Sequence, residues 1–175
     1  MRKLKVSSFL SLDGVTENPQ HISAGFFDEE ARKHAFDLLD GVDTFLAGRP
    51  SHEMFTRMWS SMAGNPYVDK LISMTKIVAS SGGPDLASTL AALKAQPGGT
   101  ILKYGVTSLD RMLLENGLVD EYHLWIFPRV VGSGRRAFEG VDPALVKLAL
   151  TQTRRFASGV IVLSYATSTS QGASK

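Results

Sequence analysis

The chain contains no cysteine. This absence excludes disulfide bridges, thiolate zinc sites and cysteine nucleophiles, and it fits an intracellular protein. There is also no run of about 18 apolar residues, so no transmembrane helix is predicted. The segment Met1–Lys5 is positively charged, but Ser7, Ser8, Ser11 and Asp13 interrupt the next stretch, and the apolar core of a signal peptide is missing. We therefore expect a cytoplasmic protein that does not associate with membranes.

A strong excess of one charge is lacking as well. The 19 Lys and Arg residues exceed the 17 Asp and Glu residues by only two, which is too little for the basic surface of a typical nucleic-acid-binding protein. The four histidines show no metal-ligand spacing, so no metal site is predicted. A length of 175 residues with 43% apolar residues fits one globular domain. We assign residues 1–166 to that domain, and we expect residues 167–175 to form a flexible tail.

The spacing of apolar residues predicts alternating strands and helices. Apolar and polar residues alternate over 3–11, which indicates a strand, and apolar residues recur at helical spacing from Phe27 to Leu39, with His34 on the apolar face as a core residue. Beyond Pro128, two strand-like runs joined by a short turn predict a hairpin. The remaining strands are expected at 44–47, 77–79, 100–104, 121–127, 145–156 and 160–165, and the remaining helices at 50–58, between 85 and 97, and between 107 and 117.

This order of elements predicts a three-layer α/β/α domain. The central sheet is expected to be mainly parallel, with helices on both faces and an antiparallel C-terminal hairpin at one edge. Open parallel sheets bind ligands at the carboxyl ends of their strands. The turns from strand to helix are therefore the candidate sites.

The first such turn runs from Gly48 into a helix. Pro50 favours the first helical turn and leaves the backbone N–H groups of Ser51 and His52 without partners. The guanidinium group of Arg49 beside them matches the geometry of a phosphate. One interpretation is an anion site, and the other is an ordinary helix start with a surface arginine.

The second turn contains Gly105, followed by a helix whose cap is Thr107 or Ser108. Glycine lets a ligand approach the backbone, and the helix N-terminus offers N–H donors to a pyrophosphate. The alternative is a glycine tolerated at a tight turn. The third turn carries Ser80 and Ser81, which are also typical of a solvated loop.

Two further segments could carry chemistry. Asp13 ends the first strand, where its carboxylate could orient a substrate or transfer a proton, or could simply favour the turn before Gly14. Gly132–Ala137 imitates the GxGxxA dinucleotide-binding pattern, but Gly140 and Pro143 follow too soon for the helix that the pattern requires. We expect an irregular loop there.

Several segments together resemble one known family. These are Ser11–Val15, Leu46–Arg49, Leu113–Tyr122, Pro128 and Gly132–Phe138. They are similar to the dihydrofolate-reductase-like family, which includes the reductase domain of the riboflavin-biosynthesis deaminase-reductase. The resemblance covers about residues 2–166, and we expect no attached deaminase domain.

The resemblance implies a three-layer fold that binds NADPH. It places Ser80 near the adenosine phosphate, and it places two groups of residues beside the cofactor phosphates. The groups are Gly48, Arg49 and Ser51, and Gly105, Val106, Thr107 and Ser108. The family usually has a second small residue where this chain has Val106.

The resemblance also raises the question of a proton donor. Dihydrofolate reductases carry an acidic residue in the first helix, and Asp28, Glu29 and Glu30 lie near that place. The insert from Glu17 to Gly25 prevents a match to a single residue, so folate reduction is not assigned.

These inferences predict an NADPH-dependent reductase that transfers a hydride to a C=N or C=O group of a small heterocyclic or ribosyl-type substrate. Asp13 is expected to orient the substrate, and Arg49 and Ser80 are expected to favour NADPH over NADH. The alternative is a nucleotide-binding or regulatory protein with the same fold and no turnover. A homodimer formed through Trp125 and residues 127–138 is compatible with either.

Overall fold

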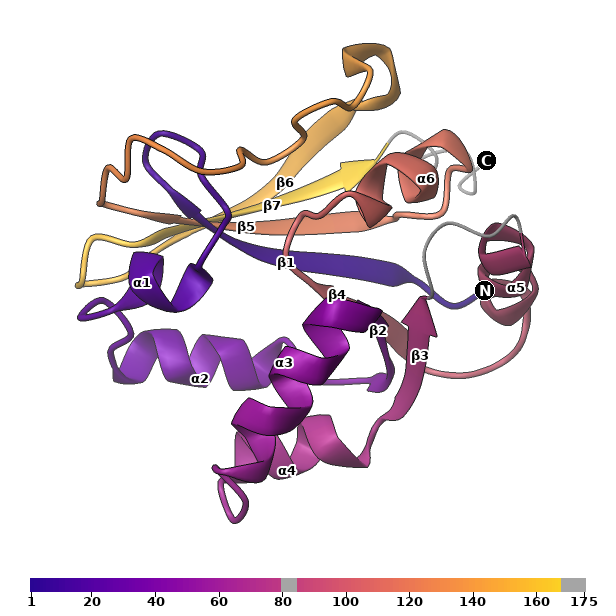
Figure 1. The fold of residues 1–175 in the computed structure, drawn as a ribbon, viewed down its shortest axis with the longest axis horizontal. Coiled ribbons are helices and arrows are strands. Elements are labelled where there is room, and N and C mark those ends of the chain that lie inside the picture. Colours follow the sequence, from indigo (N-terminus) through magenta and orange to yellow (C-terminus); the bar gives the residue numbers. More distant parts are fainter. Residues whose placement is uncertain (80–84, 168–175) are drawn as a thin grey trace.

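The computed structural model describes residues 1–79 and 85–167. Its strands form one seven-stranded sheet in the order β3-β2-β4-β1-β5-β7-β6 (Figure 1). The strands are β1 Leu4–Ser11, β2 Val42–Gly48, β3 Thr75–Ala79, β4 Thr100–Tyr104, β5 Glu121–Phe127, β6 Leu148–Arg155 and β7 Ile161–Thr167. The helices are α1 Pro19–Ser23, α2 Glu29–Asp37, α3 Arg49–Ser60, α4 Pro66–Ser73, α5 Asp85–Ala95 and α6 Leu109–Glu115, with a 3-10 turn at Pro143–Leu145.

The sheet is mixed, as the sequence predicts. Strands β1 to β5 pair in parallel, whereas β7 is antiparallel to both β5 and β6. Helices α5 and α6 contribute to the core on one face of the sheet, and α2, α3 and α4 contribute to the cores on the other. The predicted three-layer α/β/α fold with an antiparallel C-terminal hairpin is therefore confirmed.

The period of two along each strand divides its side chains between the two faces. In β5, Tyr122 and Leu124 pack in the core that contains Leu113 of α6, whereas Trp125 packs in the core that contains Ala35 of α2. Burying a large apolar side chain stabilises the folded state by about 1.5 to 3 kcal/mol. The predicted core residue His34 is also buried, with its ring against that of Trp125.

The structure adds elements that the periodicity does not predict. Helix α4 begins where the side chain of Asn65 accepts a hydrogen bond from the Tyr67 N–H at 3.0 Å, with Pro66 at its first position. Strand β6 begins at Leu148, later than predicted, because Pro143–Leu145 form a 3-10 turn capped by Asp142. Helix α1 is likewise a short helix with proline at its first position. Within the described ranges, no helix is long and apolar enough to cross a membrane.

The unequal lengths of β1 and β4 shape the place where the candidate turns meet. Strand β4 ends beside Ser7, and the N–H of Gly105 donates to the Ser7 carbonyl at 2.8 Å before the chain leaves the sheet. The rest of β1, from Ser8 to Ser11, continues alongside β5 alone. We call the ends of the five parallel strands the carboxyl edge. Their last residues are Ser11, Gly48, Ala79, Tyr104 and Phe127.

Candidate functional site

Gly48 lies at the carboxyl edge as the N-cap of α3. Its φ of −67° and ψ of 153° are allowed for any residue, and a Cβ atom placed there would meet no atom within 4 Å. The backbone of Gly48 therefore borders open space without any conformational need for glycine. A side chain at this position would fill that space.

The first turn of α3 supplies positive charge and one backbone donor. Arg49 is exposed, and its guanidinium group forms no ion pair or hydrogen bond with the described residues. Because α3 begins at Arg49, the first helical hydrogen bond joins the His52 N–H to the Gly48 carbonyl. The prediction of a free His52 N–H is therefore wrong. The Ser51 N–H, by contrast, lies before the first bonded N–H of the helix, so it has no partner within the helix.

The turn after β4, unlike the turn after β2, has a backbone conformation that favours glycine. Gly105 has a φ of +76°, which L side chains rarely adopt, although a Cβ there would approach nothing closer than Thr107 Cγ2 at 3.7 Å. Val106 turns its side chain into the core, where it is 3% exposed, and its N–H donates to Ser8 Oγ at 3.0 Å. The valine side chain therefore does not crowd the outer surface of the turn.

A buried ion pair supports the Gly105 turn from the core side. The Nζ of Lys103 lies 2.5 Å from Oδ2 of Asp110, and neither side chain is more than 2% exposed. The same carboxylate accepts the Thr107 N–H at 2.7 Å and the Tyr122 hydroxyl at 3.3 Å. The Thr107 N–H is thus already bonded within the protein. The side chain of Ser108 is exposed and makes no capping hydrogen bond.

Sequence reasoning missed the Lys103–Asp110 pair. Its signal is a lysine in a strand that is otherwise apolar at its centre, Ile101-Leu102-Lys103. A buried ammonium group needs a countercharge, so such a lysine points to an acidic partner near the end of the strand.

Of the predicted cofactor residues, Ser80 lies outside the described residues.

Asp13 connects two loops at the carboxyl edge. Its carboxylate accepts hydrogen bonds from Ser11 Oγ at 2.7 Å, the Val131 N–H at 3.1 Å and the Gly132 N–H at 2.8 Å. These bonds, the one from Ser11 first, lower the pKa of Asp13 to about 2. Asp13 is therefore ionised at neutral pH and accepts hydrogen bonds rather than donating a proton. Its role in orienting a substrate stays a prediction.

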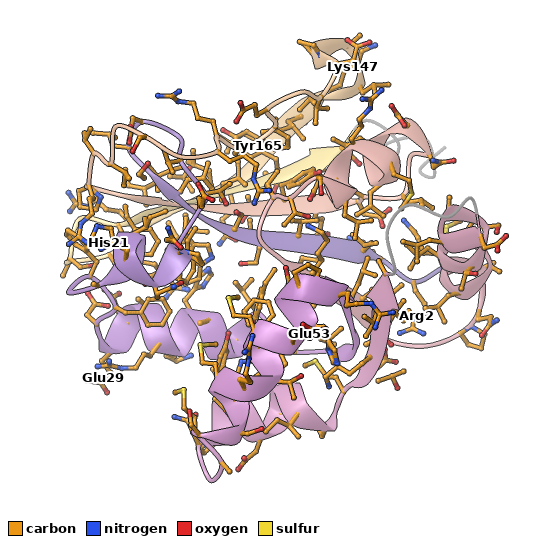
Figure 2. The ribbon with its side chains drawn as sticks, in the orientation of Figure 1. Arg2, His21, Glu29, Glu53, Lys147 and Tyr165 are labelled. Atoms are coloured by element: carbon orange, nitrogen blue, oxygen red, sulfur yellow. The ribbon has the colours of Figure 1, made fainter. Side chains whose placement is uncertain are left out.

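The acidic residues before and within α2 are placed differently. Asp28 caps the helix, because its Oδ1 accepts the Ala31 N–H at 2.8 Å, and this bond lowers its pKa. Glu29 and Glu30 are exposed, and Figure 2 shows Glu29 on the outside of the first turn of α2. Neither has an ion-pair partner within residues 1–79 and 85–167.

A large cavity lies at the opposite edge of the sheet. Its volume is about 660 Å³, and it is lined by Arg2 and by residues of β2, β3 and α5, among them Thr44, Thr75 and Leu93. Figure 2 shows Arg2 beside β3 and α5. The guanidinium group of Arg2 bonds to Thr44 Oγ1 at 2.7 Å and to the Gly99 carbonyl at 2.7 Å. Of the predicted site residues that the structure describes, none lines this cavity.

Comparisons with known proteins agree with the fold and with the resemblance. The Bacillus subtilis (strain 168) protein YyaP, described as uncharacterized, is 30% identical over 145 residues, which cover 74% of this chain and 76% of that protein. A pyrimidine reductase-like protein from Corynebacterium diphtheriae superposes with a TM-score of 0.65 and 16% identity, covering 95% and 92% of the two chains. Enterococcus faecalis dihydrofolate reductase, solved with NADP(H), superposes with a TM-score of 0.58 and 15% identity, covering 95% and 96%.

At these low identities the two solved structures establish the fold alone. The family follows from the sequence, because the model of the RibD C-terminal domain matches residues 71–162, more than half of the chain. This segment holds β4, the Gly105 turn and the Lys103–Asp110 pair. The chain belongs to the RibD C-terminal domain family and has the dihydrofolate-reductase-like fold.

Proposed function

We propose that this chain is an NADPH-dependent reductase that transfers a hydride to a C=N or C=O group of a small heterocyclic or ribosyl-type substrate. The observation that carries the proposal is the junction of β2 and α3. There, open space beside Gly48 is followed directly by the unpartnered guanidinium group of Arg49 and by the Ser51 N–H. Open backbone, a guanidinium group and a helix N-terminus are the features that bind phosphate groups.

The residues present fit such a cofactor. Arg49 and Ser51 would bind phosphate at one turn, and the exposed Ser108 would do so at the other, with Gly105 allowing close approach. Ser80 is proposed to contact the adenosine phosphate. When bound, NADPH would supply the hydride, while the protein positions the substrate and excludes water from it. Reduction of a heterocycle is also consistent with the names of the two structural neighbours.

Asp13 would act on the substrate rather than on the cofactor. Its ionised carboxylate suits an N–H or O–H group of a heterocycle or ribosyl unit. Three hydrogen bonds hold the carboxylate in place, so little freedom would be lost when a substrate binds. This role for Asp13 is part of the proposal.

Titration calorimetry with NADPH and NADH tests the cofactor assignment. We expect NADPH to bind at least about tenfold more tightly, because a charge-assisted hydrogen bond contributes about 1.5 to 3 kcal/mol. Arg49→Gln should remove most of this preference. Arg57→Gln is the matched control, because Arg57 is an exposed arginine near the other end of α3. Equal affinities in the wild-type protein would contradict the proposal.

NADPH oxidation tests turnover. We would follow nicotinamide absorbance with dihydrofolate and with a ribosylaminopyrimidine phosphate as the reducible compounds. Consumption of NADPH with either compound supports a reductase. Tight NADPH binding without consumption supports the alternative of a nucleotide-binding protein without turnover. The N–H groups of Val106 and Thr107, which bond within the protein, favour that alternative because they are lost as phosphate donors.

A further inference from the structure

Two tyrosine hydroxyl groups meet on the face of the sheet that α3 and α4 cover. Tyr104 is the last residue of β4, Tyr67 lies in the first turn of α4, and their Oη atoms are 2.5 Å apart. The ring of Tyr104 packs edge-on against Phe45 and Phe55. Tyr67 packs against this aromatic cluster and also against the neighbouring core that contains Trp125.

The pair contains one more hydrogen than it can use internally. Burial raises the pKa of Tyr67, and raises that of Tyr104 well above 10, so both hydroxyl groups keep their protons at neutral pH. One hydrogen forms the bond between the two oxygens. The other has no acceptor among residues 1–79 and 85–167. A partly buried O–H group without an acceptor is unfavourable unless water or a ligand supplies one.

Either hydroxyl group can be the donor in this bond. In the arrangement in which Tyr104 donates to Tyr67, the bond lowers the pKa of Tyr67 and the proton of Tyr67 is the one left over. Tyr104 directly precedes Gly105, and its neighbour Phe55 lies in the same helix as Arg49. The pair thus lies at the carboxyl edge, next to the Gly105 turn.

We propose that Tyr67 is the proton donor to the substrate and that Tyr104 is its positioning residue. This inference rests on the proposed function. In the reduction, the substrate carbon accepts the hydride and forms a C–H bond. The π-bond electron pair moves to the nitrogen or oxygen, which takes the proton from Tyr67 Oη. The substrate is reduced, the nicotinamide is oxidised, and solvent returns a proton to the tyrosinate that Tyr104 stabilises.

The pair also restricts the substrate class. A hydroxyl donor needs an acceptor, so the reduced group must have a lone pair on the nitrogen or oxygen that faces Tyr67. The partly buried ring of Phe55 packs edge-on beside Tyr104, and an aromatic ring at this place suits a flat heterocycle. We therefore infer that a heterocyclic C=N or C=O group, rather than an open-chain sugar carbonyl, is the hydride acceptor.

The test compares three Tyr→Phe variants, and thermal unfolding confirms that each is folded. Tyr67→Phe should lower kcat for NADPH oxidation by about 100-fold or more, the usual contribution of a general acid. Tyr104→Phe should lower it less and shift the alkaline limb of the pH profile upward, because Tyr67 loses the bond that lowers its pKa. The double variant should be no worse than Tyr67→Phe alone, since the two groups act as a unit. Tyr165→Phe is the control, because Tyr165 lies on β7 in the opposite core (Figure 2).

Two readouts do not depend on turnover. The NADPH dissociation constant should stay within about twofold in all three single variants, because the pair acts on the substrate. In a spectrophotometric titration, Tyr104→Phe should shift the ionisation of Tyr67 to higher pH. A wild-type protein that neither binds nor oxidises NADPH would reject the proposed function and this inference together. A wild-type protein that oxidises NADPH while Tyr67→Phe keeps its full rate would reject the inference alone.

Discussion

The ammonium group of Lys103 and the carboxylate of Asp110 form an ion pair 2.5 Å apart directly beneath the Gly105 turn, and both side chains are fully enclosed. Removing one partner leaves the other charge buried without a countercharge, which typically costs about 3 to 5 kcal/mol. We expect Asp110→Asn to lower the free energy of unfolding by about this amount, as measured by urea denaturation.

The double variant Lys103→Met with Asp110→Leu separates the charge effect from the loss of packing. Because both charges are removed together, its loss of stability should be smaller than that of Asp110→Asn. The exposed pair Arg111–Glu115 is the control, since a surface ion pair contributes about 0 to 1 kcal/mol. A double variant less stable than Asp110→Asn would show that the pair itself is not the main contribution.

Gly48→Val separates cofactor binding from folding. The φ of Gly48 is allowed for valine, and nothing lies within 4 Å of the added Cβ, so the melting temperature should barely change. If NADPH passes beside this backbone, the side chain should weaken NADPH binding by at least about tenfold, which corresponds to about 1.4 kcal/mol. Gly14→Ala provides the contrast, because its φ of +82° strains the backbone and should lower stability. Unchanged NADPH affinity in Gly48→Val would remove this junction from the cofactor site.

Asp13→Asn tests the residue that joins the first loop to the loop after β5. The carboxylate accepts two backbone N–H groups on separate oxygens, and an amide offers only one oxygen for them. We expect faster hydrogen exchange at Val131 and Gly132, a lower kcat with the compounds named above, and NADPH affinity near its wild-type value. Unchanged turnover together with faster exchange would limit Asp13 to holding the loop.

The buried imidazole of His34 makes stability depend on pH. Burial, aided by Arg154, lowers the pKa of His34 to about 4, from about 6.5 in an exposed histidine. Between these values the unfolded chain binds more protons than the folded one, so stability should fall as the pH decreases from about 6.5 towards 4. His34→Gln should flatten this part of the pH profile of urea unfolding, and His21→Gln, at an exposed histidine, is the control. An identical slope in His34→Gln would assign the pH dependence to other groups.

Local patterns were sufficient for most of the fold. Strands β4 and β5 begin and end where alternation and turn residues predict, because each pattern lies within a few neighbouring residues. The capping signal of α4 is equally local, in Asn65 and Pro66, and periodicity alone misses it because the helix is short. Both turns that we propose to bind phosphate were also predictable as turns, since a glycine between a strand and a helix start is visible in the sequence.

The tertiary structure decided what the side chains at these turns do. The hydrogen bonds that Asp13 accepts from Val131 and Gly132 span more than 110 residues of the chain. In the sequence Asp13 looks like a residue of a local turn, but in the fold it connects two loops. Tyr67 and Tyr104 come from elements with unrelated patterns and meet only because α4 packs against the end of β4. Periodicity reports which face of an element is apolar, but a contact between distant elements depends on how all of them pack together. For this reason the sequence determined the family, the layers and the turns of this protein, whereas the proposed proton donor and the support beneath the Gly105 turn emerged only from the packed fold.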